Sequence, residues 1–503
     1  MEHRAAKVSL VSGLSTLLGL VFQFVSVPVC LHYWGKDAYG GWLALFSAFM
    51  VIRGLDGGYT AFVGNKLNYL YHQDALALHE HLSSAVFGVA LISVLQLLLV
   101  CGTFAFEPLS VMLGMASDHA GLAAKTGLLT LMISWILTGS YLGVVHRLLI
   151  PAGLMYQAAW WAMGFQISQF VAIMASALFR LNLLETSALF ALAQLAIYVA
   201  SAWYVRRALP SFAPWLKGAR CGLGFADLGR STFLTASNLV QQGAINGFVL
   251  LISALATPSA VPAFTTVRTL TNLWTSATTI LSAPLLPDVV RMHAGGEAQK
   301  LVTINRAYWV LVGSGVNLGA VLSYPLIPFL YGLWTAHAVT LDGSLLCLLL
   351  GSVVVANAGA LMALHLNGIN SLGVVLGASV VRATLGLGIG AECYGRYGLA
   401  AFGMGILAGE FCATMMTAFF FVRYEVVAKG AHLPPSSLGP VSLSTGLVLV
   451  FFVGAALGWW TVGAVWLVTL AGVGSAAVWG WYTLEPELQD RLRAIPGKLV
   501  GLR

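Results

Sequence analysis

The sequence predicts an all-α polytopic membrane protein with about fourteen transmembrane helices. Of its 503 residues, 59% are apolar and only 9% are charged, whereas a soluble domain carries about 25% charged residues. So few charges cannot cover a surface that faces water, while about 20 apolar residues suffice for each helical crossing of a bilayer. The 55 glycines suit close helix packing in lipid.

Apolar runs bounded by charges, glycine or proline give the expected spans. These are residues 8–32, 39–64, 82–106, 121–145, 153–178, 184–205, 229–256, 258–287, 306–328, 342–364, 368–391, 397–422, 440–459 and 461–483. The first run follows a basic N-terminus, but it has the length of a span and lacks a small-residue cleavage site. We therefore expect it to be a helix and not a signal peptide.

The distribution of lysine and arginine predicts the orientation. Placing the N-terminus in the cytoplasm puts roughly eighteen basic residues on that side and about four on the other, and only Arg53, Arg268 and Arg382 fall inside spans. Both termini are then cytoplasmic. The net charge of +7 is explained by this bias and by attraction to anionic headgroups, so no nucleic-acid partner is predicted.

The motifs of common enzymes are missing from the sequence. The run His79-Glu80-His81 lacks the second histidine of the H-E-x-x-H zinc motif, and neither a G-x-S-x-G elbow nor a P-loop is present. We therefore predict no catalytic residues, no ATP hydrolysis and no metal site. The protein is not expected to be an enzyme.

Several glycines inside the spans fit a packing role. The run Gly386-Leu-Gly388-Ile-Gly390 imitates part of a dinucleotide fingerprint, but it has no strand context. Together with the pairs Gly405/Gly409 and Gly454/Gly458, spaced four apart, it indicates close contact between helices.

Five charged residues inside the spans are the first candidates for function. A charge at mid-bilayer costs about 2.5–3.5 kcal/mol on insertion scales, so such residues usually face a cavity or a partner. Arg53 and Asp56 lie three residues apart on one helix face, and Arg268, Arg382 and Glu410 lie near mid-depth. The alternatives are a pair within one helix for Arg53 and Asp56, and a structural pair between Arg382 and Glu410.

The excess of arginine favours an anionic cargo, because a guanidinium binds phosphate oxygens in a bidentate manner. The carboxylates Asp56 and Glu410 are candidates for coupling to H⁺ or Na⁺. We expect no cofactor beyond that ion.

Polar side chains at helical spacing extend the candidate site. Residues of span 229–256, span 258–287 and span 153–178 are predicted to line a wet cavity. They are Asn238, Gln241, Gln242 and Asn246, then Thr265, Thr269, Asn272 and Thr275, then Gln157 and Trp160. The alternative is hydrogen bonding between helices, which contributes only about 0.6 kcal/mol per pair. The predicted substrate-binding set is Arg53, Arg268, Arg382, Asn238, Gln241, Gln242, Asn246, Asn272, Gln157 and Trp160.

Two stretches resemble a known family. The run Tyr33-Trp-Gly-Lys-Asp-Ala-Tyr-Gly-Gly-Trp42, followed by Gly54-Leu-Asp-Gly-Gly58, is similar to the start of the Wzx-type polysaccharide and O-antigen flippases. These proteins are part of the multidrug/oligosaccharidyl-lipid/polysaccharide exporter superfamily. Span 229–256, Arg268, and the run Ala283-Pro-Leu-Leu-Pro-Asp288 with a charged loop ending near Lys300 resemble the start of the family's second half.

The resemblance implies two six-helix lobes around a central cavity, plus two extra C-terminal helices. The lobes would be residues 1–206 and 229–423, joined by a cytoplasmic linker at 207–228, with the extra helices and a cytoplasmic tail in 424–503. It also implies alternating access, in which the lobes rock about a site near the midplane.

The cargo implied by the resemblance is an undecaprenyl-pyrophosphate-linked oligosaccharide repeat unit, moved across a bacterial inner membrane for polysaccharide biosynthesis. The partners would be this lipid-linked substrate, membrane lipids, and polysaccharide polymerase and export machinery. A cation-coupled multidrug exporter of the sibling branch is the alternative in the same class. A membrane-embedded polysaccharide polymerase or ligase is the alternative in another class.

Overall fold

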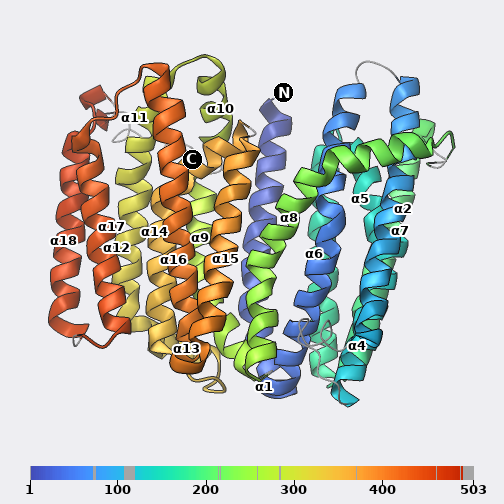
Figure 1. Cartoon of the computed structure of the whole chain (residues 1–503), viewed down its shortest axis with the longest axis horizontal. Helices are drawn as coiled ribbons and strands as arrows, with labels where there is room; N and C mark the ends of the chain where they lie inside the picture. Colours follow the sequence, from blue (N-terminus) through green and yellow to red (C-terminus); the bar gives the residue numbers. More distant parts are fainter. Residues whose placement is uncertain are drawn as a thin grey trace. The chain divides into compact units, whose positions relative to one another are not determined.

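The computed structural model describes residues 2–71, 75–106, 119–212, 215, 217–257, 259–282, 285–369, 371–459, 462–487 and 489–490. Within these ranges the chain is helical and contains no strand (Figure 1). The α-helices are α1 (Glu2–Leu70), α2 (Ala75–Ala105), α4 (His119–Ser134), α5 (Ser140–Val145), α6 (Met155–Leu178), α7 (Leu183–Ala208), α8 (Cys221–Leu255), α9 (Ala260–Ser282), α10 (Leu286–Ala294), α11 (Ala298–Tyr308), α12 (Ser314–Ser323), α13 (Ile327–Trp334), α14 (Gly343–Gly368), α15 (Leu372–Tyr397), α16 (Ala400–Phe420), α17 (Pro435–Ala456) and α18 (Val462–Thr483). Short 3₁₀ turns are η2 (His146–Leu149), η3 (Pro210–Phe212), η6 (Tyr324–Leu326) and η8 (Val427–Lys429).

The chain is a multi-pass membrane protein. Among the described residues, 12 helices are long and apolar enough to cross a bilayer. One of them, Gly13–Leu70, has 58 residues and therefore the length of two spans. It is interrupted at Gly35, where φ is 73° and ψ is 179°. A positive φ of this kind is readily adopted by glycine, so a single residue separates the two predicted spans.

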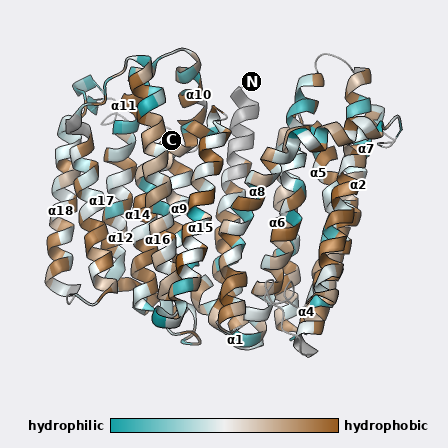
Figure 2. Cartoon of the chain, viewed as in Figure 1, coloured by the Kyte–Doolittle hydropathy of each residue, from teal (hydrophilic) through white to brown (hydrophobic). Residues whose placement is uncertain are grey.

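Helix α9 is the remaining predicted span. It has 23 residues, but its polar face lowers its mean hydropathy, so it is not among the 12 helices counted above. With α9 and the break in α1, the helices of the described chain reproduce the predicted spans. Figure 2 shows hydrophobic residues along most of the helix lengths, with hydrophilic ones concentrated near the ends of several helices, as around α10.

In the described part of the chain, three π-helical turns interrupt the long helices: η1 (Trp135–Gly139), η5 (Trp309–Gly313) and η7 (Phe421–Val426). Such turns shift the side chains that follow and are frequent at functional sites. Here η1 carries Trp135 and η7 carries Glu425, and both residues contact charged groups from other helices. Neither turn was predicted from the apolar pattern.

Several helix ends follow directly from the sequence. Asn182 and Glu185 form a capping box at the start of α7. The side chain of Asp342 accepts a hydrogen bond of 2.9 Å from the backbone of Leu345 at the start of α14. Gly398, with a φ of 57°, lies between α15 and α16.

The contacts between Cα atoms divide the chain into two compact units. Unit 1 comprises Met1–Thr265 and Gly332–Thr340, and unit 2 comprises Thr266–Tyr331 and Leu341–Arg503. Helix α8 packs against α1 and α2 and therefore falls in unit 1. The lobes with boundaries at 206 and 229 rest on the family resemblance and stay a prediction.

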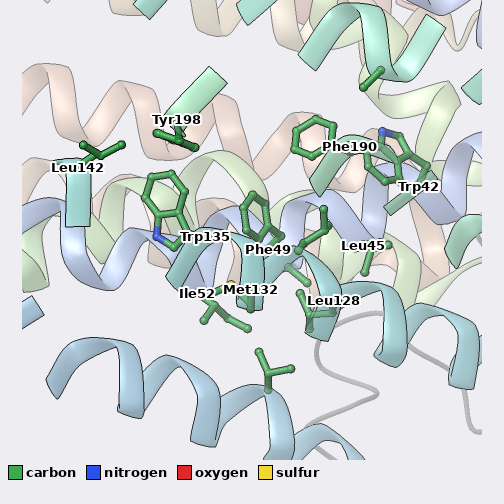
Figure 3. Close-up of a cluster of buried hydrophobic side chains, with 14 of the residues drawn as sticks. Trp42, Leu45, Phe49, Ile52, Leu128, Met132, Trp135, Leu142, Phe190 and Tyr198 are labelled. Atoms are coloured by element: carbon green, nitrogen blue, oxygen red, sulfur yellow. The ribbon is translucent and has the colours of Figure 1, made fainter. Parts of the chain in front are cut away.

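Each unit has its own core. In unit 1, an aromatic and aliphatic cluster forms where α1, α4, η1 and α7 meet, and Figure 3 shows Phe49, Trp135, Tyr198 and Phe190 within it. In unit 2, α14 is the most enclosed span: 83% of its most apolar window is buried. It packs against α16 and α17, and α16 also packs along α15.

Candidate functional site

Asp56 is the centre of the polar group in unit 1. Its side chain is only 4% exposed. One oxygen, Oδ2, accepts a hydrogen bond of 2.7 Å from the indole Nε1 of Trp135 and another from the hydroxyl of Ser140. Trp135 lies in η1 and Ser140 begins α5, so the π-helical turn brings both donors to α1. Both hydrogen bonds go to the same oxygen, so this buried acceptor is satisfied by side chains of the neighbouring helices.

Arg53 lies on the face of the same indole. Its guanidinium carbon is 3.8 Å from the centre of the Trp135 ring, which is a cation–π contact. The described structure contains no salt bridge between Arg53 and Asp56 within 4 Å, and an Arg53 nitrogen lies 3.7 Å from the sulfur of Met50. The ring therefore contacts both charged groups, with its N–H edge toward the acid and its face toward the base.

The polar residues of α8 differ in the contacts that they make. Asn238 donates a hydrogen bond of 2.6 Å to the carbonyl of Gly54 on α1, which is the interhelical alternative. Asn246 donates one of 3.0 Å to Gln242 within α8. Gln241 is exposed.

The remaining candidates of unit 1 lie on α6, which packs against α1 and α7. The Oε1 atom of Gln157 is buried and has no hydrogen-bond partner among the described residues. Trp160 is 48% exposed, while the neighbouring ring of Trp161 packs on Tyr204.

The polar group of unit 2 is centred on Glu410 of α16. Its Oε1 lies 2.6 Å from Nε of Arg382 on α15, and Arg268 on α9 interacts with it electrostatically. The contact with Arg382 is a close ion pair that lacks the direction of a hydrogen bond, and Oε2 of Glu410 is buried without a hydrogen-bond partner. Arg268, Arg382 and Glu410 together carry one net positive charge. Asn272, also on α9, is exposed.

Close packing of α15 on α16 sets this geometry. A Cβ atom added to Gly409 would lie 2.7 Å from the carbonyl oxygen of Arg382, and one on Gly405 would collide with the carbonyl of Gly386. The predicted packing role is confirmed for Gly405 and Gly409, but it is wrong for Gly388 and Gly458, where an added Cβ meets nothing within 4 Å. Because the backbones touch here, the side chains of Arg382 and Glu410 are held within ion-pair distance.

The predicted site residues therefore fall into separate groups. Arg53 and Asp56 gather around Trp135, and Asn238 joins α8 to the same helix two residues from Asp56. Arg268, Arg382 and Glu410 form the group of unit 2. The residues Ala283 and Pro284, part of the family resemblance, lie outside the described residues.

Sequence reasoning missed Trp135, which is separated from Asp56 by 79 residues. It also missed a cluster of His293, His365 and Glu425. The sequence holds no local spacing signal for either, because each group is assembled from several helices.

Comparison with known proteins shows the fold. No protein-family model matches the chain, and no curated protein matches it. The lipid II flippase MurJ, in an inward closed conformation, aligns with a TM-score of 0.67 and 13% identity over 94% of this chain and 97% of that one. An inward-facing multidrug resistance MATE family transporter of the MOP superfamily gives a TM-score of 0.63 and 15% identity over 84% and 98%. A mutant of the Vibrio cholerae MATE transporter VcmN gives 0.53 and 17% over 83% and 97%.

Proposed function

We propose that this chain is a flippase that moves undecaprenyl-pyrophosphate-linked oligosaccharide repeat units across a bacterial inner membrane by alternating access. The observation that carries the proposal is the group of Arg268, Arg382 and Glu410. Two guanidiniums and one carboxylate give a net positive charge inside spanning helices, where charged residues usually mark a binding site or pathway. A pyrophosphate offers oxygens in the geometry that arginine binds best.

The fold comparison supports a lipid-linked cargo. The lipid II flippase covers 94% of this chain, whereas the MATE transporters cover 83–85%. The longer match is in keeping with two helices beyond a twelve-helix transporter. A transporter of this fold has no need of catalytic residues, in accord with the missing enzyme motifs.

Asp56 and Glu410 are the proposed coupling sites for H⁺ or Na⁺. Asp56 is buried beside polar donors, and Glu410 keeps one oxygen without a hydrogen bond. Both termini are proposed to be cytoplasmic, and a polysaccharide polymerase and export machinery are the proposed partners. If Asp56→Asn and Glu410→Gln both transport normally with the ion gradient collapsed, neither carboxylate couples transport to an ion.

The second candidate function is a cation-coupled multidrug exporter. It is favoured by the TM-score of 0.63 to a multidrug resistance MATE transporter. The net positive charge of the group in unit 2 argues against it, because a cationic drug would be repelled there.

The decisive experiment is deletion of the gene followed by identification of lipid-linked sugars on the cytoplasmic face of the inner membrane. We expect one complete undecaprenyl-linked repeat unit to accumulate while surface polymer is lost. Sensitivity to cationic dyes without accumulation would establish the exporter instead. Loss of polymerisation, with repeat units already translocated, would establish the polymerase or ligase.

The arginines are tested by complementation of the deletion. Arg268→Ala and Arg382→Ala should abolish export at normal protein level, and Arg268→Lys should restore part of it, because the charge returns without the bidentate geometry. The matched control is Arg396→Ala, an exposed arginine near the end of α15. Normal export by Arg268→Ala would refute the headgroup role.

A further inference from the structure

Three elements of unit 2 bring together a second charged cluster, outside the proposed transport site. His293 lies on α10, His365 near the end of α14 and Glu425 on η7. Their potential ligand atoms all lie within 4.8 Å of one another. Oε2 of Glu425 is 2.7 Å from Nδ1 of His293 and 3.2 Å from Nε2 of His365. The ammonium of Lys429, on η8, is 2.7 Å from the same oxygen.

No arrangement of protons satisfies all these contacts. Nζ of Lys429 lies 3.0 Å from Nδ1 of His293, so a charged ammonium requires that nitrogen to accept a hydrogen bond. The carboxylate oxygen 2.7 Å away requires the same nitrogen to donate one. A nitrogen cannot do both. If Nδ1 accepts, its lone pair faces a lone pair of the carboxylate, and if it donates, its N–H faces an N–H of the ammonium.

A metal ion resolves this conflict, because it accepts lone pairs from several ligands at once. Two imidazole nitrogens and one carboxylate oxygen are a common ligand set for Zn²⁺, with bonds of about 2.0–2.2 Å. Donor atoms around a tetrahedral ion lie roughly 3.3 Å apart, close to the 3.2 Å between His365 and Glu425. The 2.7 Å between His293 and Glu425 is shorter, so these two side chains must move apart when an ion binds.

The candidate ligands are also buried to the extent that is typical of a metal site. The side chain of His365 is 0% exposed, and its Nδ1 has no hydrogen-bond partner among the described residues. The pocket is closed on one side by the ring of Phe421, which meets the imidazole of His365 edge-on. His293 is 30% exposed and Lys429 28%, so an ion can enter from their side.

We propose that His293, His365 and Glu425 bind a divalent first-row transition metal ion of the Zn²⁺ class, and that the ion displaces the ammonium of Lys429. Lys429 carries a flexible side chain on a short 3₁₀ turn and can move toward solvent. The bound ion joins α10, α14 and the end of α16. It has no part in binding the cargo, so this proposal stands independently of the transport function.

The test is titration of the full-length, tag-free protein in detergent with Zn²⁺, and with Co²⁺ as a spectroscopic probe. We expect one ion per chain, a Co²⁺ spectrum with nitrogen and oxygen ligands, and a higher melting temperature with Zn²⁺ present. His293→Gln and His365→Gln should each weaken binding by about tenfold or more. Lys429→Gln should tighten it, because the competing charge is gone.

The matched control is His432→Gln, which changes an exposed histidine close in sequence and should leave the affinity unchanged. If His365→Gln fails to fold, the partly exposed His293 carries the test alone. Lack of binding at about 100 µM Zn²⁺, equal affinity of the wild type and His293→Gln, or no tightening by Lys429→Gln would each overturn the proposal.

Discussion

At the scale of single residues, Trp135 connects two charges of opposite sign. Its indole N–H bonds Asp56 while its face receives Arg53. Trp135→Phe keeps an aromatic ring but removes the donor to a buried carboxylate. We expect a loss of about 1–3 kcal/mol in the free energy of unfolding, measured as a lower melting temperature in detergent.

The control for this prediction is Trp203→Phe. Trp203 also has an arginine, Arg207, over its ring, but it is 58% exposed and forms no described bond to a carboxylate. Equal melting temperatures for the two variants would contradict a special role of the bond to Asp56.

Glu410 should be harder to replace than either arginine beside it. Glu410→Gln leaves two guanidiniums without their carboxylate, and we expect a cost of about 2 kcal/mol. Arg382→Gln should cost about 1 kcal/mol or less, because Arg382 is 37% exposed and Glu410 still interacts with Arg268.

The melting temperatures of both variants and of the double variant Arg382→Gln/Glu410→Gln test this order. The double variant should be more stable than Glu410→Gln alone, since one unpaired charge is removed. A larger loss of stability for Arg382→Gln than for Glu410→Gln would refute the view that Glu410 interacts with both arginines.

The sequence allowed the pair of Arg382 and Glu410 to be anticipated, because the two residues lie at similar depth on consecutive spans. It could not show Trp135 beside Asp56. Depth in the membrane follows from the apolar pattern, but the rotation of each helix about its axis follows from packing, and η1 changes that rotation locally.

At the scale of helices, α15 and α16 are in contact through their glycines. Gly409→Val would place a branched side chain against the carbonyl of Arg382, where an added Cβ already lies 2.7 Å away. We expect a loss of about 1–3 kcal/mol and a weaker ion pair at Arg382.

The control is Gly388→Val on α15, where an added Cβ meets nothing within 4 Å. Expression level and melting temperature in detergent should separate the two variants. Similar effects of both would mean that the close approach of the helices does not limit side-chain size.

Hydropathy predicted the helices well where they are uniformly apolar. It placed a connection between residues 32 and 39, whereas α1 continues through that stretch with a break only at Gly35. Helix α9 is polar on one face, and although its apolar run predicted a span, it is not among the 12 helices of sufficient hydropathy. The π-helical turns cannot be predicted from the apolar pattern, because their residues are of the same types as those of the helices around them.

At the scale of the whole molecule, α17 and α18 are built into unit 2 through α12. Asn317 is 1% exposed and donates a hydrogen bond of 2.9 Å to Ser444 on α17. Trp466 on α18 donates one of 2.7 Å to the carbonyl of Val321.

A chain that ends at residue 434 should therefore fail to give a monodisperse peak in size-exclusion chromatography. Removal of α17 leaves the amide of Asn317 without its partner Ser444, and an unpaired buried polar group costs about 1–3 kcal/mol. Trp466→Phe in the full chain should lower the melting temperature only slightly. A monodisperse truncated protein with the wild-type melting temperature would show that unit 2 folds without α17 and α18.

The fold class followed from the sequence because membrane spans are a property of local composition. The proposed cargo rests on the excess of arginine over acidic residues inside the predicted spans, together with a family resemblance. The cluster of His293, His365 and Glu425 could not be anticipated, because helices distant in sequence supply its members.

The enclosure of α14 has a consequence for how the protein tolerates change. Its apolar window is 83% buried, against 22% for α18, although both are hydrophobic enough to face lipid. In a scan of all substitutions, α14 should reject residues by volume, as the interior of a soluble domain does. α18 should tolerate apolar side chains of any size but should not tolerate polar ones. Two helices that are both apolar enough to span a membrane would thus show opposite patterns of permitted variation.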